Sequence, residues 1–594
     1  MSPASSRPAP VRRRPRGRRL TLSDPQRRMR FALCVVLTLL IVIGGRLVQL
    51  QGLDGTKYAT AAEQQRLTTI DLPAARGQIL DRDGNPLAYS VQARAVFADP
   101  GMIEAPSRTA LALAPLLGTT ADEILALLSA GGRFVYLDRG LDPAVAQSVM
   151  DLQLPGIGSL AEQRREYPGA TTAAQVVGFV NQDVEGLAGI EQQFDDVLTG
   201  TPGELVYEQG RFGVPIPAAT QSETAAVPGS SVQLSLDQDL QFVLERAIAT
   251  ANAEPGVSTV QAVVLDTRTG QVLAMGGSPG YDAARPGDVN GDLLGNPTVS
   301  NVIEPGSVNK LVTFAGSLEE GLITPDSELT VPDHLAVSDI VINDAWAHDP
   351  IDFTATGVLA KSSNVGTVLI AQKLGNDRLE DYLRRFGLGA PTGIELPAES
   401  GGILVPNEEW SGSQAGTIPF GQGISMTVLQ MASMYQAVAN DGVLVPPRIV
   451  ERVIGPDGTA VAQPRPDSRR VVSSDTAAEL RYMLEAVTSE EGTGPRARIE
   501  GYRVAGKTGT AQRPNPECSC YDGGGYWATF AGFAPADDPR YVIAVSVEQP
   551  TGDSHGGAIA APVFTSIMSY ALQEYGVTPS GTAAPRFRLT TDAD

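Results

Sequence analysis

One serine in this chain precedes a lysine at a spacing suited to acyl transfer. The segment IEPGSVNKLVTFAGSLEEG places Pro305 and Gly306 before an apolar run of helical period, so Ser307 is expected at the start of a helix. Lys310 then follows on the same helix face. A hydroxyl at the positive end of a helix, with an amine within reach, suits a serine nucleophile that works without histidine. Taken alone, this four-residue motif is weak, and a helix-capping serine with a surface lysine explains it better than chemistry does.

Two later segments favour the chemical interpretation. Ser362 and Asn364 lie between two runs of helical character, which places a hydroxyl and an amide at a break between helices. Lys507, Thr508, Gly509 and Thr510 lie in YRVAGKTGTAQ, a predicted strand with YWATFAGFAP and YVIAVSVEQ as expected partners. A lysine and two hydroxyls along a strand suit the binding of a substrate carboxylate and backbone, and Gly509 permits close approach.

Lysine usage sharpens these expectations. The chain has 40 arginines and five lysines, and two of the lysines are Lys310 and Lys507. Arginine cannot serve as a base because its guanidinium stays protonated in proteins. The three histidines, His334, His348 and His555, are widely spaced, so neither a histidine-ligated metal site nor a histidine-dependent triad is expected.

The chain that must position these residues is divided into modules by polar, proline-containing stretches. Gln261–Gly277 and Arg76–Ser90 are each predicted to form a β-hairpin. The clearest linker is Pro215–Ser230, between a module of about 170 residues and one long block that extends to about Val577. The last residues are expected to form an exposed tail.

Composition and charge exclude several classes of protein. The chain has 594 residues, 42% of them hydrophobic, which is enough for a sizeable folded core. Its net charge is −22, although the first 30 residues hold ten arginines and one acid, Asp24. The acidic remainder argues against nucleic-acid binding.

The N-terminal region predicts a membrane anchor. Residues 31–45 are uncharged and apolar, and with Arg46 and LVQL they reach the length of a bilayer-spanning helix. The preceding arginines place the N-terminus in the cytoplasm, and the absence of a cleavage site soon after the apolar run disfavours a cleaved signal peptide. Cys34 lies in this segment, so only Cys518 and Cys520 remain outside it, where an oxidising compartment would permit a bond between them.

The ordered trio Ser-x-x-Lys, Ser-x-Asn and Lys-Thr-Gly resembles the penicillin-recognising serine enzymes. The resemblance extends from Arg76 to about Tyr575 and is closest to class B penicillin-binding proteins, above all the septal cell-division transpeptidase of high-GC Gram-positive bacteria. The further motifs that carry it are Arg76–Gly84, Arg165–Pro168, Gly186–Glu191, Glu304–Gly306, Gly421–Ile424 with Thr427 and Gln430, Gly556–Gly557 and Ala561–Phe564. Two features depart from the family pattern: Asn309 before the lysine, and the Cys518–Gly525 insertion.

The resemblance implies an α+β catalytic domain, with a mostly antiparallel sheet, covering helices and an all-helical lobe. A β-rich N-terminal pedestal domain and one transmembrane helix precede it. The boundaries expected are 1–30 for a basic cytoplasmic tail, 31–50 for the anchor, 51–228 for the pedestal, 229–577 for the transpeptidase domain and 578–594 for a flexible tail. The pedestal motif RGQILDRDG could be a salt-bridged hairpin or a direct partner-binding element.

It also implies a mechanism without metal or other cofactor. Ser307 would attack the penultimate D-alanine carbonyl of a stem peptide after losing its proton to Lys310. Ser362 would relay a proton to the leaving group, and Asn364 would orient the stem amide. Lys507, Thr508 and Thr510 would hold the terminal carboxylate beside Gly509, with the Ser307 and Thr510 N–H groups as the oxyanion hole.

The implied substrates are the lipid-linked peptidoglycan precursor and nascent glycan stem peptides, with β-lactams as inhibitors. A membrane glycan polymerase and other division proteins are the implied partners, and the catalytic domain would lie outside the cell membrane. Three alternatives stay open: a lateral-wall transpeptidase, a penicillin-hydrolysing or carboxypeptidase relative, and a mainly scaffolding division protein. The large pedestal and the anchor argue against the second.

Overall fold

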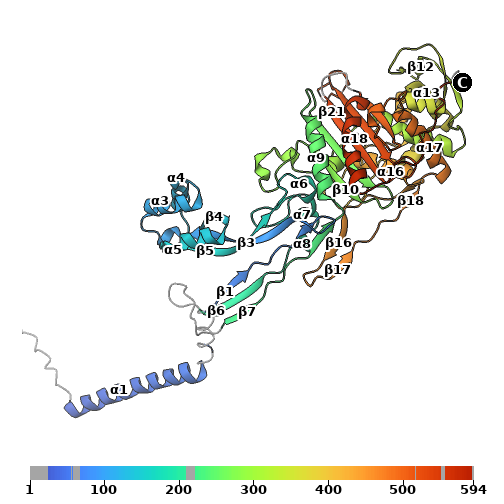
Figure 1. The fold of residues 1–594 in the computed structure, drawn as a ribbon. Coiled ribbons are helices and arrows are strands. Elements are labelled where there is room, and N and C mark those ends of the chain that lie inside the picture. Colours follow the sequence, from blue (N-terminus) through green and yellow to red (C-terminus); the bar gives the residue numbers. More distant parts are fainter. Residues whose placement is uncertain are drawn as a thin grey trace, which may run out of the picture. The chain divides into compact units, whose positions relative to one another are not determined.

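The computed structural model describes residues 24–54, 57, 67–208, 221–515, 517–518, 520–549 and 555–591. Contacts divide the chain into two compact units, Met1–Asp71 with Glu204–Thr224 and Leu72–Gly203 with Ala225–Asp594. The helices and strands of each unit are labelled in Figure 1. Most of the expected basic tail, residues 1–23, and residues 215–220 of the expected linker lie outside the described residues.

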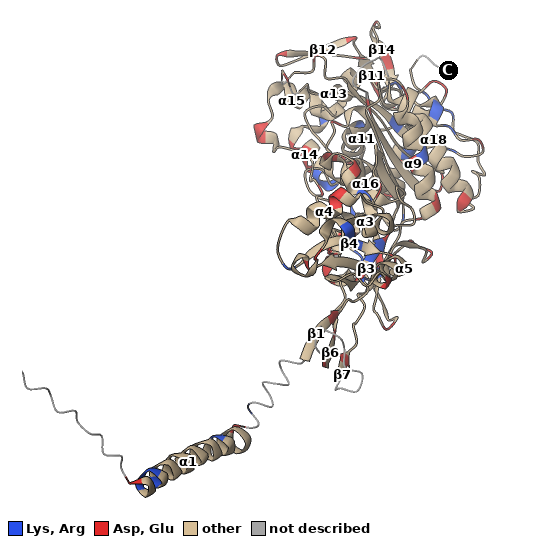
Figure 2. Ribbon diagram, turned by 90° about the vertical axis from the view of Figure 1, so that its left-hand side faces the viewer, with Lys and Arg blue, Asp and Glu red and all other residues tan. Residues whose placement is uncertain are grey.

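The first unit contains one long apolar helix, α1 (Pro25–Val48), which continues as a π-helical turn at Gln49–Leu53. Asp24 caps it by accepting a hydrogen bond from the Gln26 amide at 3.1 Å. Basic residues, Arg27, Arg28 and Arg30, lie at its N-terminal end, which is coloured blue in Figure 2. The helix is long and apolar enough to cross a membrane, and none of its residues is buried. A helix over residues 31–50 is therefore confirmed.

The same unit holds a small three-stranded sheet in the order β1-β6-β7, with bounds β1 (Leu67–Leu72), β6 (Gly203–Glu208) and β7 (Gln221–Thr224). Strand β7 pairs antiparallel with β6 and falls inside the linker expected at Pro215–Ser230. Part of that stretch is therefore a strand.

The second unit begins with a hairpin whose sheet also includes strands from much later in the chain. The turn is held by Asp81, whose carboxylate accepts hydrogen bonds from the Asp83 and Asn85 amides. The predicted hairpin over residues 76–90 is confirmed. The sheet has the order β17-β16-β8-β2-β3-β4, and β5 pairs with β3. Its strands are β2 (Ile79–Leu80), β3 (Pro86–Ala98), β4 (Val135–Leu141), β5 (Ile157–Glu166), β8 (Ser231–Leu234), β16 (Val450–Ile454) and β17 (Ala460–Ala462).

Three helices pack near the far end of β3 and form a small core of their own. They are α3 (Pro106–Leu117), α4 (Ala121–Ser129) and α5 (Pro143–Asp151). The buried side chains that they share with β3 include Val96, Leu113, Ile124 and Val149. Thr120 starts α4 with a capping box that also uses Glu123.

A buried charge cluster joins three distant motifs of the pedestal. The Glu191 carboxylate is fully buried and accepts from Arg76 at 2.6 Å and from Arg165 at 2.7 Å. Arg76 also donates to Asp195 at 2.7 Å. Arg76, the first residue of RGQILDRDG, therefore forms its ion pairs with Glu191 of the later Gly186–Glu191 motif and with Asp195, and not with residues of the hairpin.

The long block after the linker is built around a five-stranded antiparallel sheet in the order β10-β9-β21-β20-β19. Its strands are β9 (Thr259–Asp266), β10 (Val272–Ser278), β19 (Ala505–Gln512), β20 (Tyr526–Ala534) and β21 (Tyr541–Gln549). The predicted hairpin β9–β10 and the predicted grouping of β19, β20 and β21 are confirmed. Strand β19 lies at the sheet edge.

Both faces of this sheet are buried, with alternate side chains in different cores. Val264 and Val545 belong to the core formed with α9 (Gln238–Asn252) and α18 (Gly556–Glu574), which lie beside the sheet in Figure 1. Val263 and Ala544 belong to the larger core on the other face. Burial on both faces explains why β9, β20 and β21 appear in the sequence as nearly continuous apolar runs.

The larger core is shared with a lobe made mainly of helices. These are α11 (Lys310–Glu319), α12 (Ala355–Lys361), α13 (Asn364–Leu374), α14 (Asn376–Arg385), α15 (Gly412–Thr417), α16 (Val428–Ala439) and α17 (Ser474–Thr488). The family resemblance implied an all-helical lobe, but the lobe also contains two antiparallel strand pairs. These are β11 (Glu328–Val331) with β14 (Ile351–Thr354) and β12 (His334–Val337) with β13 (Ile340–Asn343).

Short elements complete the chain. They are η2 (Pro100–Met102), α6 (Ala174–Val177), α7 (Gly189–Gln193), α8 (Asp195–Leu198), η4 (Pro286–Asp288), η5 (Gly291–Leu293), α10 (Pro297–Ser300), η6 (Gly306–Asn309), η7 (Asn407–Glu409), η8 (Ile418–Phe420), β15 (Val443–Leu444), β18 (Arg469–Arg470) and η9 (Pro495–Ala497).

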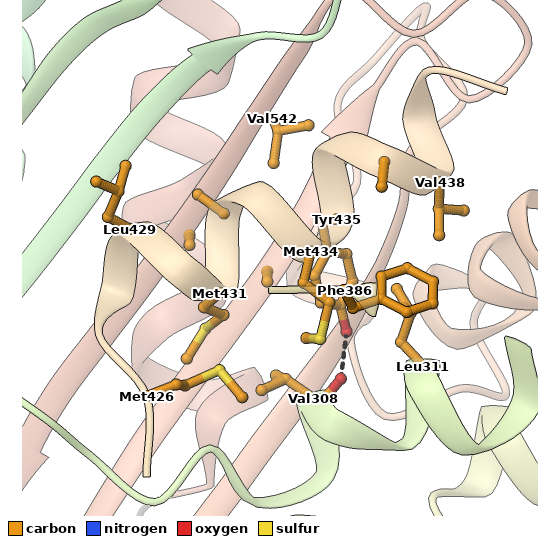
Figure 3. Packing of buried hydrophobic residues seen from close by; sticks show 14 of the residues in the cluster. Val308, Leu311, Phe386, Met426, Leu429, Met431, Met434, Tyr435, Val438 and Val542 are labelled. Carbon is orange, nitrogen blue, oxygen red and sulfur yellow. Dashed lines mark hydrogen bonds between the residues drawn. The ribbon is translucent and has the colours of Figure 1, made fainter. Parts of the chain in front are cut away.

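Helix α16 is buried along its whole length and supports the segment that carries the predicted nucleophile. Met431, Met434 and Tyr435 pack toward Val308 and Leu311 (Figure 3). The Tyr435 hydroxyl donates to the Val308 carbonyl at 3.0 Å. The backbone directly after Ser307 is thereby fixed from behind.

The C-terminal residues differ from the exposed, flexible tail expected from residue 578. Leu589 is buried and packs with Ala360, Ala486 and Phe587. Its carbonyl accepts from the Thr354 amide at 3.0 Å, at the start of α12. The sequence pattern was too weak to predict this packing, because Phe587 and Leu589 are two apolar residues in an otherwise polar segment.

Candidate active site

The predicted nucleophile lies in the short 3₁₀ turn η6, directly before α11. Gly306 precedes Ser307 with φ +59, a left-handed conformation that glycine adopts without strain, and its amide donates to the Gly421 carbonyl at 3.0 Å. Ser307 is half-buried. Among the contacts of the described residues its hydroxyl makes no hydrogen bond, so it is available to a substrate. Ser307 is thus near a helix start, as predicted.

Ser307 borders a cleft of about 640 Å³ between the sheet edge and the helical lobe. All three sequence motifs meet there. The predicted residues that line it are Ser307, Ser362, Asn364, Thr508, Gly509 and Thr510. A cleft of this size accommodates a small ligand or the end of a peptide.

Lys310 lies at the base of the arrangement and is fully buried. Its Nζ donates to the Ser362 carbonyl at 2.6 Å, the Asn364 Oδ1 at 2.8 Å and the Ser362 hydroxyl at 3.2 Å. Burial lowers the pKa of Lys310 to about 7, and the negative charge of Asp344 acts in the opposite direction. Near neutral pH the amine is therefore divided between its charged and neutral forms.

The second motif occupies a sharp break between two helices, as predicted. Ser362 ends α12 in a left-handed conformation with φ +63, which is uncommon for a residue with a side chain. Ser363 caps α13, since its hydroxyl accepts from the Gly366 amide at 2.9 Å. This turn directs both Ser362 and Asn364 at the Lys310 amine.

Sequence reasoning missed Asp344, which lies directly beneath the turn. Its side chain is fully buried and accepts from the Ser363 hydroxyl at 2.7 Å, and from the amides of Asn364 at 2.5 Å and Val365 at 3.0 Å. His348 Nε2 faces the same carboxylate at 3.2 Å. A lone aspartate in a turn after β13 has no periodic or motif signal, so nothing in the sequence pointed to it.

The third motif lies on the edge strand β19. Lys507 is fully buried, and its Nζ donates to the Thr508 carbonyl at 3.0 Å. Burial lowers the pKa of Lys507 well below its usual value, and the positive charge of Lys310 adds to this effect. The hydroxyls of Thr508 and Thr493 are 2.7 Å apart, and Thr510 Oγ1 accepts from the Gly556 amide at 3.2 Å.

Gly509 is required by close packing between β19 and the nucleophile segment. A Cβ placed there would come 2.1 Å from Thr529 Oγ1 and 2.8 Å from the Pro305 carbonyl oxygen. The close approach at this glycine is therefore that of the protein's own Thr529 side chain and Pro305 backbone. Close approach of a substrate to Gly509 stays a prediction.

Of the two departures from the family pattern, one lies within the nucleophile segment and the other contacts the residues just before it. Asn309 is buried, and its Nδ2 donates to the Ile418 carbonyl at 3.0 Å, which ties the residue before Lys310 to η8. In the insertion, Cys518 and Cys520 are joined by a disulfide. The neighbouring Tyr521 hydroxyl donates to the Glu304 carboxylate at 3.1 Å.

The fold and the three motifs around one cleft define a serine acyltransferase of the penicillin-binding kind, and the family comparison agrees. The description "Penicillin binding protein transpeptidase domain" matches residues 260–569, and "Penicillin-binding Protein dimerisation domain" matches residues 71–234. The chain belongs to this family of penicillin-binding transpeptidases.

Curated relatives match over most of their length. Penicillin-binding protein PbpB of Mycolicibacterium smegmatis is 44% identical over 89% of this chain and 87% of its own. Peptidoglycan D,D-transpeptidase FtsI of Escherichia coli is 34% identical over 93% of this chain and 92% of its own. The crystal structure of penicillin-binding protein 3 from Mycobacterium tuberculosis complexed with aztreonam is 39% identical, covers 88% of this chain and all of its own, and superposes with a TM-score of 0.70.

Proposed function

We propose that this protein is a peptidoglycan D,D-transpeptidase that crosslinks stem peptides through an acyl-enzyme on Ser307 and acts in septal wall synthesis. The observation that carries the proposal is the buried Lys310 amine, in contact with Ser362 and Asn364 at the cleft that Ser307 borders. A relative named peptidoglycan D,D-transpeptidase, which this chain matches over nearly its whole length, supports the substrate class. The crystal structure of a similar protein in complex with aztreonam supports β-lactam binding.

In the first half-reaction, the Ser307 Oγ attacks the carbonyl carbon of the penultimate D-alanine while its proton passes to neutral Lys310. An ammonium at Lys310 would use all three protons on the oxygens of Ser362 and Asn364. Loss of one proton leaves a lone pair that can accept the Ser307 proton, and the ammonium so formed passes a proton to the Ser362 hydroxyl. Ser362 then relays the proton to the leaving nitrogen, the C–N bond breaks and D-alanine departs.

The carboxylate of the terminal D-alanine would bind at Lys507, Thr508 and Thr510. A bound carboxylate would favour the charged form of Lys507, because an opposite charge offsets the effect of burial. The Ser307 and Thr510 N–H groups would stabilise the oxyanion. In the second half-reaction, an amine of another stem attacks the acyl carbon, the ester bond to Ser307 breaks, and the proton returns to the serine.

The wider setting of the enzyme is part of the same proposal. We propose a cytoplasmic N-terminus, because Arg27, Arg28 and Arg30 precede the apolar stretch of α1, and an extracytoplasmic catalytic domain. The pedestal would comprise residues 51–228 and the transpeptidase domain residues 229–577. Lipid-linked precursor and nascent glycan would supply the stems, and a membrane glycan polymerase and other division proteins would be its partners.

Acylation is tested with the full chain in detergent and a fluorescent penicillin, followed by mass-spectrometric mapping of the labelled peptide. We expect the label on Ser307 and its loss in Ser307→Ala. Ser300→Ala is the matched control, since in the described structure the hydroxyl of this nearby serine bonds only to the Asn296 carbonyl and the Asn301 side chain, and its loss should leave labelling unchanged. A folded, unlabelled wild-type protein, or labelling that survives in Ser307→Ala, would contradict the proposed nucleophile.

The septal role is tested in the host bacterium by replacing the wild-type gene with the Ser307→Ala form. We expect division to fail, with filamentous cells. Loss of rod shape with normal septation would instead indicate lateral-wall synthesis. Normal division with normal crosslinking would indicate a scaffold.

A further inference from the structure

Asp344 is a carboxylate removed from solvent next to a site whose chemistry depends on proton transfer. The loop that carries it contributes Asn343, Ala345 and Trp346 to the cleft wall, while the Asp344 side chain turns inward and is fully buried. A buried charge is costly unless hydrogen bonds and opposite charges compensate for it. The neighbours of Asp344 show how this is achieved.

Hydrogen bonds to Asp344 come from two sides. From α13, it accepts the Ser363 hydroxyl and the first free amides of the helix, those of Asn364 and Val365. From its own loop, it faces His348 Nε2, and His348 Nδ1 lies 2.7 Å from the Asp349 carbonyl oxygen. The Asn364 side chain also donates to the Asn343 carbonyl at 3.2 Å, so loop and turn are tied at both ends.

We propose that Asp344 is a positioning residue of the acylation step: through its hydrogen bonds it holds the turn that presents Ser362 and Asn364 to Lys310, and its buried carboxylate is part of the charge environment of that amine. This inference rests on the proposed function, because it assigns a role within the Ser307–Lys310 chemistry. Asp344 acts through Lys310 and the turn and does not itself contact substrate.

The charged and titratable groups around Lys310 show why such a charge matters. Lys310 enters from α11, Lys507 from β19, and Asp344 with His348 from the loop after β13. The two lysines are both fully buried, and the positive charge of Lys310 disfavours the charged form of Lys507. At Lys310, the Asp344 charge opposes the effect of burial. Without the Asp344 charge, the pKa of Lys310 would be lower still, so the neutral amine would persist to lower pH. The amine would also be a weaker base toward the Ser307 proton.

The Asp344 charge determines the direction in which the pH–rate profile of acylation should move. Neutral Lys310 is the base, so acylation rises with pH through the pKa of Lys310. Removing the Asp344 charge lowers that pKa, and the midpoint of the pH–rate profile should move to lower pH by about 0.5–1 unit. Asp344→Asn and Asp344→Ser both retain a good helix-capping side chain, so the turn keeps an acceptor for its amides.

The experiment measures the second-order rate constant of acylation by a fluorescent penicillin from pH 5.5 to 8.5, on the full chain in detergent. Ser363→Ala removes a hydrogen bond to Asp344 without changing its charge, and should lower the plateau while leaving the midpoint in place. Asp457→Asn, an equal charge change in an exposed turn, should alter neither. Thermal unfolding of each variant reports whether it is folded.

The outcomes separate the alternatives. A midpoint shift in the neutral Asp344 variants but not in Ser363→Ala supports the inference. If Asp344→Asn and Asp344→Ser fold and keep the wild-type midpoint, the inference is overturned. It is also overturned if neither variant folds, because Asp344 would in that case be a structural cap alone. Absence of labelling in the wild-type chain would contradict the proposed function instead, so the two failures are distinguishable.

Discussion

Lys310 shows how a residue's surroundings decide its chemistry. The pKa of Lys310 is lowered to about 7 because burial disfavours the charge. Below that pH the amine is protonated and cannot accept the Ser307 proton. We therefore expect the acylation rate constant to fall about tenfold per pH unit below the midpoint and to level off above it. The rate of fluorescent penicillin labelling across this range checks the prediction.

A Lys310→Arg variant provides the companion measurement. It keeps the positive charge but cannot donate a lone pair, because arginine stays protonated. We expect acylation to slow by at least about 100-fold, the usual contribution of a general base. Retention of near wild-type acylation in this variant would show that another group takes the proton.

Gly509 illustrates a residue whose importance lies in the side chain it lacks. In Gly509→Ala, the new methyl group would clash with Thr529 Oγ1 and the Pro305 carbonyl oxygen. We expect a loss of about 1–3 kcal/mol in the free energy of unfolding and a marked fall in acylation, since β19 would move away from the nucleophile segment. Denaturant titration and penicillin labelling measure the two effects.

The control for that substitution is Gly287→Ala. A Cβ at Gly287 would meet no atom within 4 Å. Stability and labelling should both remain at the wild-type level. Equal effects of the two substitutions would mean that the packing at Gly509 is not what matters.

At the scale of elements, prediction succeeded where a local pattern was sufficient. The strands β9, β20 and β21 are largely apolar runs, and the break at Ser362 separates two helical runs, so both could be predicted. Strand β19 is more polar and was predicted together with its expected partners β20 and β21. Asp344 and Thr493 reach the site through contacts between segments far apart in the chain, and single residues in turns carry no period. The site motifs were therefore predictable, and the residues that hold them were not.

The C-terminal segment is an element that the sequence pattern did not reveal, and it supports α12. Leu589 and the Arg588 carbonyl contact Thr354, the residue that caps α12, and that helix ends at Ser362. A chain that ends at Pro585 should lose about 1–3 kcal/mol of stability and should acylate more slowly, because the start of α12 loses its partners. Chemical denaturation and the labelling rate check this.

The matched chain ends at Thr591 and keeps all of these contacts. It should behave as wild type in both measurements. Should the two shortened chains be indistinguishable, the docking of Leu589 would have no bearing on the site.

At the scale of the whole molecule, the pedestal and the transpeptidase part share a sheet. Strand β8 pairs with β2 of the pedestal on one side and with β16, from the catalytic block, on the other. Arg82 in the β2–β3 turn also donates to the Tyr575 hydroxyl at 3.1 Å, and Tyr575 donates to Asp237 at 2.6 Å. The boundary proposed at residues 228 and 229 therefore lies two residues before a strand that both parts need.

This sharing predicts that the transpeptidase part depends on the pedestal for stability. In a chain that starts at Gly229, β8 would lose β2, and Val232 and Leu234, both fully buried, would be partly uncovered. Full exposure of each side chain would cost about 1.5–3 kcal/mol, and Asp237 would lose its contact with Arg82. We expect this chain to unfold several degrees below one that starts at Leu72, as measured by thermal denaturation. Equal unfolding temperatures would mean that β8 and β16 suffice to close the sheet, and that the pedestal contributes its surface rather than its fold to the enzyme.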